Sequence, residues 1–341
     1  MAALDYNKRL ANLQSRRYDP GLREYAVTNK FSASDVPADV KYLFESMRPI
    51  DQKYNAKTIQ AAENVRTRLE RDFNLHFQRD YRTQGSVKTN TNIRVHSDFD
   101  LLTIVNKYFY EETNSGAVYT ATDPNDDIVE MRKQATAIMK RQYDKVDDTG
   151  DKCISIENQN LHRKVDIVFG FWYSTDEYKK NNNEYYRGVD LYNFKIKQRQ
   201  RDYPFATMSN VNYKGDQTLD GSRKGIRLLK NLRADSDTDF KLLKSFQLTS
   251  IVHGIEDHLL VYYQGSELKI AQEMSEQLKK LIEEPAYRVS LQSPNGIERP
   301  LYSAETVPEL IKLKADLDLL IEDAATDIAG SYNLQRTILS Y

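Results

Sequence analysis

Two short apolar segments that each carry acidic residues most constrain how this chain can fold. They read "DFDLLTIV" (98–105) and "HRKVDIVFGFW" (162–172). Both are rich in Leu, Ile, Val or Phe, which is typical of buried strands. Side chains two positions apart on a strand lie on the same face. The pattern therefore predicts that Asp98 and Asp100 are neighbours on one strand, and that Asp166 lies within a second, otherwise hydrophobic strand.

The surrounding segments predict an α+β fold in two parts. Helical spacing of apolar residues predicts helices over 58–73 and 126–146, and strands are expected at 76–84 and 153–158 with a polar loop at 106–124. After about residue 200 the segments are mostly helical. We therefore expect a catalytic core of mixed sheet and flanking helices over 1–200, including an N-terminal helical segment, and a helical lobe over 201–341. The first 40 residues are expected to pack across both parts.

The spacing of Asp98 and Asp100 is weak on its own, because other Asp-x-Asp pairs in the chain are expected to cap or lie on helices: Asp235/Asp237, Asp237/Asp239 and Asp316/Asp318. The pair at 98 and 100 differs because it opens an apolar strand and follows Gly85-Ser86, with eleven residues between Ser86 and Asp98. A buried carboxylate such as Asp166 must be paired, hydrogen-bonded or metal-bound. All three explanations stay open for it.

The chemistry that suits this pattern is phosphoryl transfer with two metal ions. Mg²⁺ prefers oxygen ligands and keeps substrate phosphates alongside carboxylates. Two acids on one strand and a third beside them can bind two ions that stabilise the attacking and leaving oxygens. Gly85-Ser86 at the end of a strand would let backbone amides approach a triphosphate closely, although a Gly-Ser pair alone is more often an ordinary turn.

These residues resemble a known family. The segment "YRTQGSVKTNTNIRVHSDFDLLTI" with the later strand "KVDIVF" resembles the nucleotidyltransferases of the DNA polymerase beta superfamily, and within it the cGAS/DncV-like nucleotidyltransferases (CD-NTases) of bacterial anti-phage CBASS operons. The resemblance implies a polymerase-beta-like palm with the active site in a cleft against the helical lobe, and it implies that the lobe over 201–341 binds nucleotide. It also implies that Asp98, Asp100 and Asp166 are catalytic and bind two Mg²⁺ ions, with Mn²⁺ as an alternative, and that the donor phosphates contact Gln84, Gly85 and Ser86.

A second, shorter match lies in the helical half. "GIRLLKNLR" resembles the family helix whose lysine reaches the donor triphosphate, and "LLKSFQLTS" resembles the segment that binds phosphate and stacks on a base. The matching positions are Lys230, Ser245 and Phe246. Without the family, Lys230 would be interpreted as a snorkelling lysine at the edge of an apolar stripe and Phe246 as a core aromatic residue.

Composition and motif content exclude several other classes of protein. The chain has 49 basic and 50 acidic residues, so its net charge of -1 gives no global attraction for nucleic acid or an anionic membrane. The single cysteine, Cys153, excludes an internal disulfide and a cysteine-rich zinc site, and it suits the cytoplasm. Neither a signal peptide nor an apolar run of membrane-spanning length is found. Walker A, H-E-x-x-H and G-x-S-x-G motifs are absent.

The resemblance therefore implies a synthase of cyclic di- or trinucleotide second messengers in anti-phage defence. Its partners would be NTP substrates (ATP and also GTP, UTP or CTP) and a downstream effector reached through the product, without a membrane or a long nucleic acid. A monomer is expected. The alternative enzyme is a linear nucleotidyltransferase, of the oligoadenylate-synthase or macromolecule-modifying type, and a non-catalytic nucleotide-binding protein is the alternative of a different class. Base identity, ring size and linkage depend on pocket shape and stay open.

Overall fold

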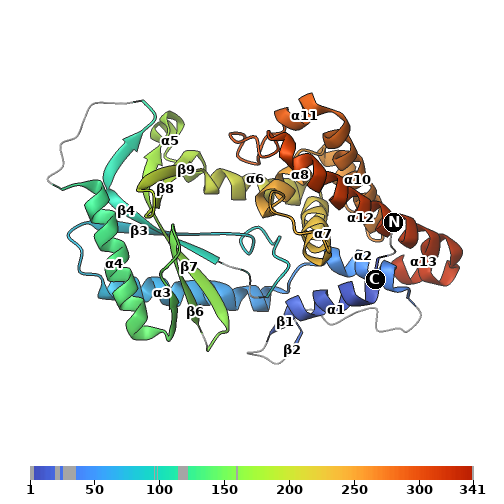
Figure 1. The fold of residues 1–341 in the computed structure, drawn as a ribbon, viewed down its shortest axis with the longest axis horizontal. Coiled ribbons are helices and arrows are strands. Elements are labelled where there is room, and N and C mark those ends of the chain that lie inside the picture. The colour runs from blue at the N-terminus through green and yellow to red at the C-terminus, as the bar shows by residue number, and fades with distance from the viewer. Residues whose placement is uncertain are drawn as a thin grey trace.

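The computed structural model describes residues 4–19, 24–25, 36–95, 97, 99–113, 122–158 and 160–339. Its described elements form two parts that lie side by side (Figure 1). We call the part with the large sheet the palm and the other part the helical lobe. Among these residues, we find no helix with the length and apolar character needed to cross a membrane.

The palm is built on a seven-stranded mixed sheet. Strands β3 (Gln78–Gln84), β4 (Phe99–Glu111), β7 (Arg163–Ser174), β6 (Cys153–Asn158) and β5 (Lys145–Asp147) follow in that order, while β8 (Arg187–Asn193) pairs with β7 and β9 (Gln198–Asp202) pairs with β8. Strands β4 and β7 are parallel, and the other pairs are antiparallel. The sheet thus places the two strands that carry predicted acids next to each other.

Two long helices cover one face of this sheet, α3 (Gln52–Asp72) and α4 (Pro124–Gln142). Helix α4 begins where the sequence favours it, because Asp123 accepts a hydrogen bond from the Asn125 amide and proline occupies the first turn. The apolar sides of both helices pack on strand residues that include Leu101, Val165 and Ile167. Because side chains alternate along a strand, Asp100 and Asp166 point to the opposite face.

The helical lobe contains α6 (Pro204–Gln217), α7 (Gly221–Asp235), α8 (Ser245–His253), α9 (Asp257–Leu260), α10 (Glu267–Glu283), α11 (Pro285–Ser290), α12 (Val307–Gly330) and α13 (Tyr332–Leu339). Its apolar core also includes residues of α1 (Tyr6–Arg17) and α2 (Ala38–Met47), such as Leu13 and Val40. The chain passes from β9 to α6 at Tyr203, close to the expected boundary at residue 200. The division into two domains there stays a prediction, and packing groups α1 and α2 with the later helices.

Several predicted boundaries were wrong. The expected loop at 106–124 is strand as far as Glu111, because Tyr108 and Tyr110 pack edge-on against Phe171 of β7. Helix α4 ends at Gln142 rather than 146, since β5 begins at Lys145. Helix α3 starts at Gln52, where Asp51 caps it, and not at 58. The β8–β9 hairpin was not predicted; β9, a polar strand, lies at one edge of the sheet.

Candidate active site

Asp100 and Asp166 are lateral neighbours on one face of the sheet. They are paired residues in the parallel register of β4 and β7, and Gln84 is the partner of Asp100 on β3. The Gln84 Nε2 donates to Asp100 Oδ2 at 3.0 Å. Gln84 therefore orients one of the predicted acids in this structure, in addition to flanking the Gly85-Ser86 turn.

Asp98, the first predicted acid, lies outside the described residues. Among those that are described, no group of three His, Cys, Asp or Glu side chains is placed to hold a metal ion. The two described acids are partly exposed, and carboxylate oxygens are the ligands that Mg²⁺ prefers. Burial, and the negative charge of Asp166 nearby, raise the pKa of the Cys153 thiol on the neighbouring strand. Asp100 and Asp166 are therefore the described residues that would contribute carboxylate oxygens to a cation on this face.

A second strand holds Asp166 from the other side. Ser155 of β6 lies opposite Asp166 in the antiparallel register, and its Oγ donates to Asp166 Oδ1 at 2.6 Å. The Lys164 ammonium lies 3.5 Å from the same oxygen. Both contacts fall on Oδ1, so the carboxylate is held in one orientation. Sequence reasoning missed Ser155, although the alternation in "CISIEN" places it on the polar side of its strand.

The turn after β3 contains the Gly85-Ser86 pair. Gly85 has φ 118°, a conformation that favours glycine. The Thr91 amide donates to the Ser86 carbonyl oxygen at 2.9 Å, and the Lys88 amide donates to that of Gly85 at 3.1 Å. These bonds close residues 85–91 into a compact loop directly beside Gln84 and Asp100.

Lys230 reaches this loop from the helical lobe. Its Nζ lies 3.1 Å from the Thr91 carbonyl oxygen and 3.4 Å from Thr91 Oγ1. The residue is 7% exposed, so it does not snorkel to the surface. Burial, reinforced by the Arg227 guanidinium, lowers the pKa of Lys230 to about 8. The structure therefore brings Lys230 to the Gly85-Ser86 loop.

Ser245 and Phe246 are placed differently. They form the first turn of α8, which packs against α7, and both side chains are exposed. Phe246 is 36% exposed, which contradicts the alternative of a core aromatic residue. Among the described residues, neither side chain hydrogen-bonds the two acids or the 85–91 loop.

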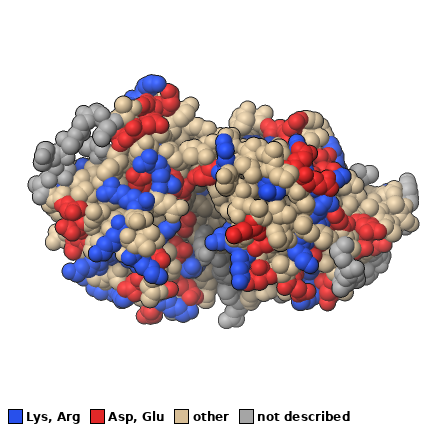
Figure 2. Space-filling view, turned by 45° about the horizontal axis from the view of Figure 1, so that its top comes forward, with Lys and Arg blue, Asp and Glu red and all other residues tan. Residues whose placement is uncertain are grey.

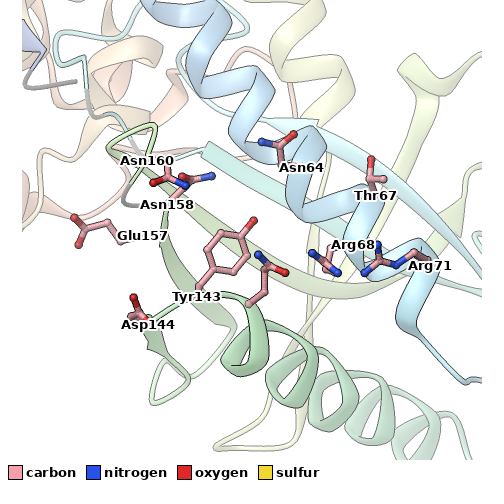
Figure 3. A pocket seen from close by; sticks show the side chains of 10 residues that line it. Asn64, Thr67, Arg68, Arg71, Tyr143, Asp144, Glu157, Asn158 and Asn160 are labelled. Atoms are coloured by element: carbon pink, nitrogen blue, oxygen red, sulfur yellow. The ribbon is translucent and has the colours of Figure 1, made fainter. Parts of the chain in front are cut away.

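Two hollows adjoin the sheet. A groove of about 660 Å³ includes Ser155 and Lys164, the two contacts of Asp166, together with His162 and residues of β5. A polar pocket of about 440 Å³ lies between α3, the end of α4 and β6, where Arg68 and Arg71 face Tyr143 (Figure 3). That pocket contains none of the predicted site residues. The groove does not include Asp166 itself, but it includes the two side chains that contact the Asp166 carboxylate.

The far end of the acid-bearing face carries a cluster that the sequence did not reveal. The Trp172 Nε1 donates to Asp80 Oδ2 at 2.6 Å, and the Arg187 guanidinium lies 3.7 Å from the Trp172 ring centre. Arg82 pairs with Glu184 beside them. The cluster joins β3, β7 and β8, and only their register brings these residues together.

Comparison with known proteins places this geometry in a family. No protein-family model matches the chain. A c-di-GMP synthase of a Lachnospiraceae bacterium (strain RUG226) is 32% identical over 285 residues, which cover 75% of this chain and 80% of that protein. The cyclic dinucleotide synthase CdnE of Yersinia aleksiciae is 28% identical over 336 residues, covering 94% of this chain and 87% of that one.

The fold agrees with these relatives. The solved structure of a STING-associated CdnE c-di-GMP synthase from Capnocytophaga granulosa has a TM-score of 0.80 and 27% sequence identity, covering 95% of this chain and 99% of that chain. The predicted fold class, a mixed-sheet palm with a helical C-terminal lobe, is therefore confirmed. The relatives favour cyclic synthesis over the linear and non-catalytic alternatives. The chain belongs to the CD-NTases of bacterial CBASS anti-phage systems, and it is a nucleotidyltransferase of the cyclic oligonucleotide synthase type.

Proposed function

We propose that the product is a cyclic dinucleotide, cyclic di-GMP, made from two molecules of GTP. The names of the Lachnospiraceae and Capnocytophaga relatives support guanine as the base. The single structural observation that carries the reaction is the row Gln84, Asp100, Asp166 and Ser155 across four adjacent strands. It sets two carboxylates side by side, with the 85–91 loop on one side and the groove at Ser155 and Lys164 on the other.

The row suggests how the two nucleotides are arranged. The donor triphosphate would lie at the β3 end, against the 85–91 loop and Lys230, with its base against Phe246 and a phosphate on Ser245. The acceptor would occupy the groove that begins at Ser155 and Lys164. Asp166 stands between the two places, so it is suited to orient the acceptor ribose hydroxyl or accept its proton.

In this arrangement the acceptor hydroxyl attacks the α-phosphorus of the donor and a new phosphodiester bond forms. The bond from the α-phosphorus to the oxygen that bridges it to the β-phosphorus breaks, and pyrophosphate leaves with that oxygen and the electron pair. Asp98, Asp100 and Asp166 would hold Mg²⁺ or Mn²⁺, which when bound supplies positive charge to the attacking and leaving oxygens. A second transfer within the same cleft closes the ring. Each transfer uses the same residues of this chain.

The surface supports small nucleotides as substrates. On the face shown in Figure 2, basic and acidic side chains are interspersed over both parts, and the surface is hollowed between them. A long nucleic acid would require an extended basic track. We propose that the enzyme works in the cytoplasm as a monomer and reaches its effector through the diffusible product.

The test is incubation of the purified protein with Mg²⁺ and each NTP alone, then with all pairs, followed by phosphatase treatment. GTP alone should yield a phosphatase-resistant product. A requirement for a second NTP would overturn the base assignment and leave the cyclase reaction itself intact.

A further inference from the structure

Residues 16–19, which we call the strap, join the helical lobe to the palm next to the site. They lie at the end of α1 and in β1 (Tyr18–Asp19), beneath the junction of the two parts (Figure 1). Helix α1 itself is fixed to the helical lobe: Tyr6 donates to Asp323 and Arg9 pairs with Asp316, both on α12. The strap is therefore the point at which this anchored helix meets the palm.

The last residue of the strap makes a buried ion pair with an acid-bearing strand. Asp19 Oδ2 lies 2.9 Å from Nη2 of Arg163, and both side chains are 0% exposed. Arg163 opens β7, three residues before Asp166. Its other N–H groups donate to Thr58 Oγ1 and to the carbonyl oxygens of residues 54, 161 and 162. All five donors of the guanidinium are thus engaged, which fixes its position.

The first residue of the strap contacts both parts at once. The Arg16 carbonyl oxygen accepts a hydrogen bond of 3.0 Å from the Val95 amide, three residues before Asp98 in the sequence. Its guanidinium binds both oxygens of Asp235 at 2.6 and 2.7 Å, and it donates to Asn231 Oδ1 at 2.9 Å. Asn231 follows Lys230 on α7. Arg16 therefore links the approach to β4 with the helix that carries the phosphate-site lysine.

We propose that the strap sets the position of the helical lobe relative to the two acid-bearing strands, with Asp19 and Arg163 as positioning residues for nucleotidyl transfer. The inference rests on the proposed function, because a donor nucleotide would contact the palm through the 85–91 loop and the helical lobe through Lys230. A small displacement between the parts would misplace the donor phosphates against the acids. Misplacement on the order of 1 Å can lower a rate about 100-fold.

The test compares two variants of the full-length protein. Asp19→Asn removes the charge from the contact between the strap and β7 at nearly constant side-chain volume. Arg9→Ala is the control, because it breaks a partly buried Arg–Asp pair of the adjoining helix α1 that stays within the helical lobe. For each variant we would measure the melting temperature, hydrogen exchange of the Val95 amide, and kcat and KM for GTP.

We expect Asp19→Asn to raise KM and lower kcat together, each by about tenfold, and to speed exchange of the Val95 amide. Arg9→Ala should leave kcat, KM and the exchange rate of the Val95 amide near their wild-type values, even if its melting temperature falls as much as that of Asp19→Asn. If Asp19→Asn does not fold, Arg163→Lys replaces it, because it keeps the charge and loses the forked contacts. Unchanged exchange and kinetics in the folded variant, or the same changes in Arg9→Ala, would overturn the proposal. Wild-type protein that turns over no GTP would instead contradict the proposed function, while the exchange measurement needs no turnover.

Discussion

Asp100 and Asp166 are paired residues of adjacent parallel strands, and each accepts a hydrogen bond from a neutral side chain on its outer neighbour strand, Gln84 and Ser155. The two carboxylates are thus placed by strand register and oriented from both sides. Such outer contacts restrict a carboxylate before a cation arrives. This preorganisation underlies the first two predictions.

Replacing either acid should abolish synthesis while the fold persists. Asp100→Asn and Asp166→Asn keep the side-chain shape and an oxygen that Gln84 or Ser155 can contact. Loss of a metal-binding charge removes several kcal/mol of transition-state stabilisation, so we expect turnover to fall by about 10³-fold or more. Asp237→Asn is the control, since this residue has the same Asp-x-Asp spacing and its side chain is 93% exposed. Equal turnover in all three variants would remove the acids from the mechanism.

Ser155→Ala should change how the enzyme responds to metal. Loss of an outer hydrogen bond to a metal-binding carboxylate typically lowers metal affinity or activity about 10–100-fold. We expect the Mg²⁺ concentration for half-maximal activity to rise, and Ser155→Thr to restore it because the hydroxyl is kept. The measurement is a Mg²⁺ titration of initial rate at saturating GTP. An unchanged Mg²⁺ dependence in Ser155→Ala would show that Asp166 is oriented without this bond.

Lys230 should make GTP binding depend on pH. Its pKa in the folded protein is about 8, lower than the usual value of 10.5, so the ammonium is lost as pH rises through 8. In the proposed role of Lys230 the charged form binds the donor phosphates, so KM for GTP should rise between pH 7 and 9. In the same pH window the free energy of unfolding should increase with pH. The reason is that Lys230 loses its proton in the folded protein while it still keeps its proton in the unfolded chain.

The matched variant for that prediction is Lys230→Arg, whose guanidinium stays protonated throughout the range. It should flatten the dependence of KM on pH if it binds GTP at all at pH 7. A wild-type KM that stays constant from pH 7 to 9 would place the lysine outside the phosphate site.

Phe246 should contribute to binding through its exposed ring. Stacking of a base on an aromatic side chain is worth about 1–3 kcal/mol, so Phe246→Ala should raise KM for GTP roughly tenfold or more, and Phe246→Tyr should not. Little stability should be lost, because the ring is partly exposed. Tyr302→Ala, at a tyrosine that is 66% exposed elsewhere on the helical lobe, is the control. Identical KM values for Phe246→Ala and wild type would exclude stacking.

Local patterns predicted the parts of the site that lie within single elements. The apolar runs around Asp100 and Asp166 indicated β4 and β7, and Gly85-Ser86 indicated the end of β3. The pairing of Asp100 with Asp166, and of Ser155 with Asp166, depends on strand register. Register follows from tertiary packing, so no window of one sequence contains it.

The partners of long-range contacts could not be predicted from sequence patterns for the same reason. Helical spacing indicates which side of a helix is buried and leaves its partner open. Of the first 40 residues, which were expected to pack across both parts, the described Arg16 and Asp19 have contacts in both; residues 1–3, 20–23 and 26–35 lie outside the described residues. The partners of Arg16 and Asp19 are Asp235 and Arg163, which are 219 and 144 positions away in the chain.

The most direct test of the account is mass spectrometry of the phosphatase-resistant product formed from GTP and Mg²⁺, with an Asp98→Ala/Asp100→Ala double variant run in parallel. We predict the mass of cyclic di-GMP from the wild-type protein and no resistant product from the variant. Linear, phosphatase-sensitive products from the wild type, or equal amounts of cyclic product from both proteins, would contradict it.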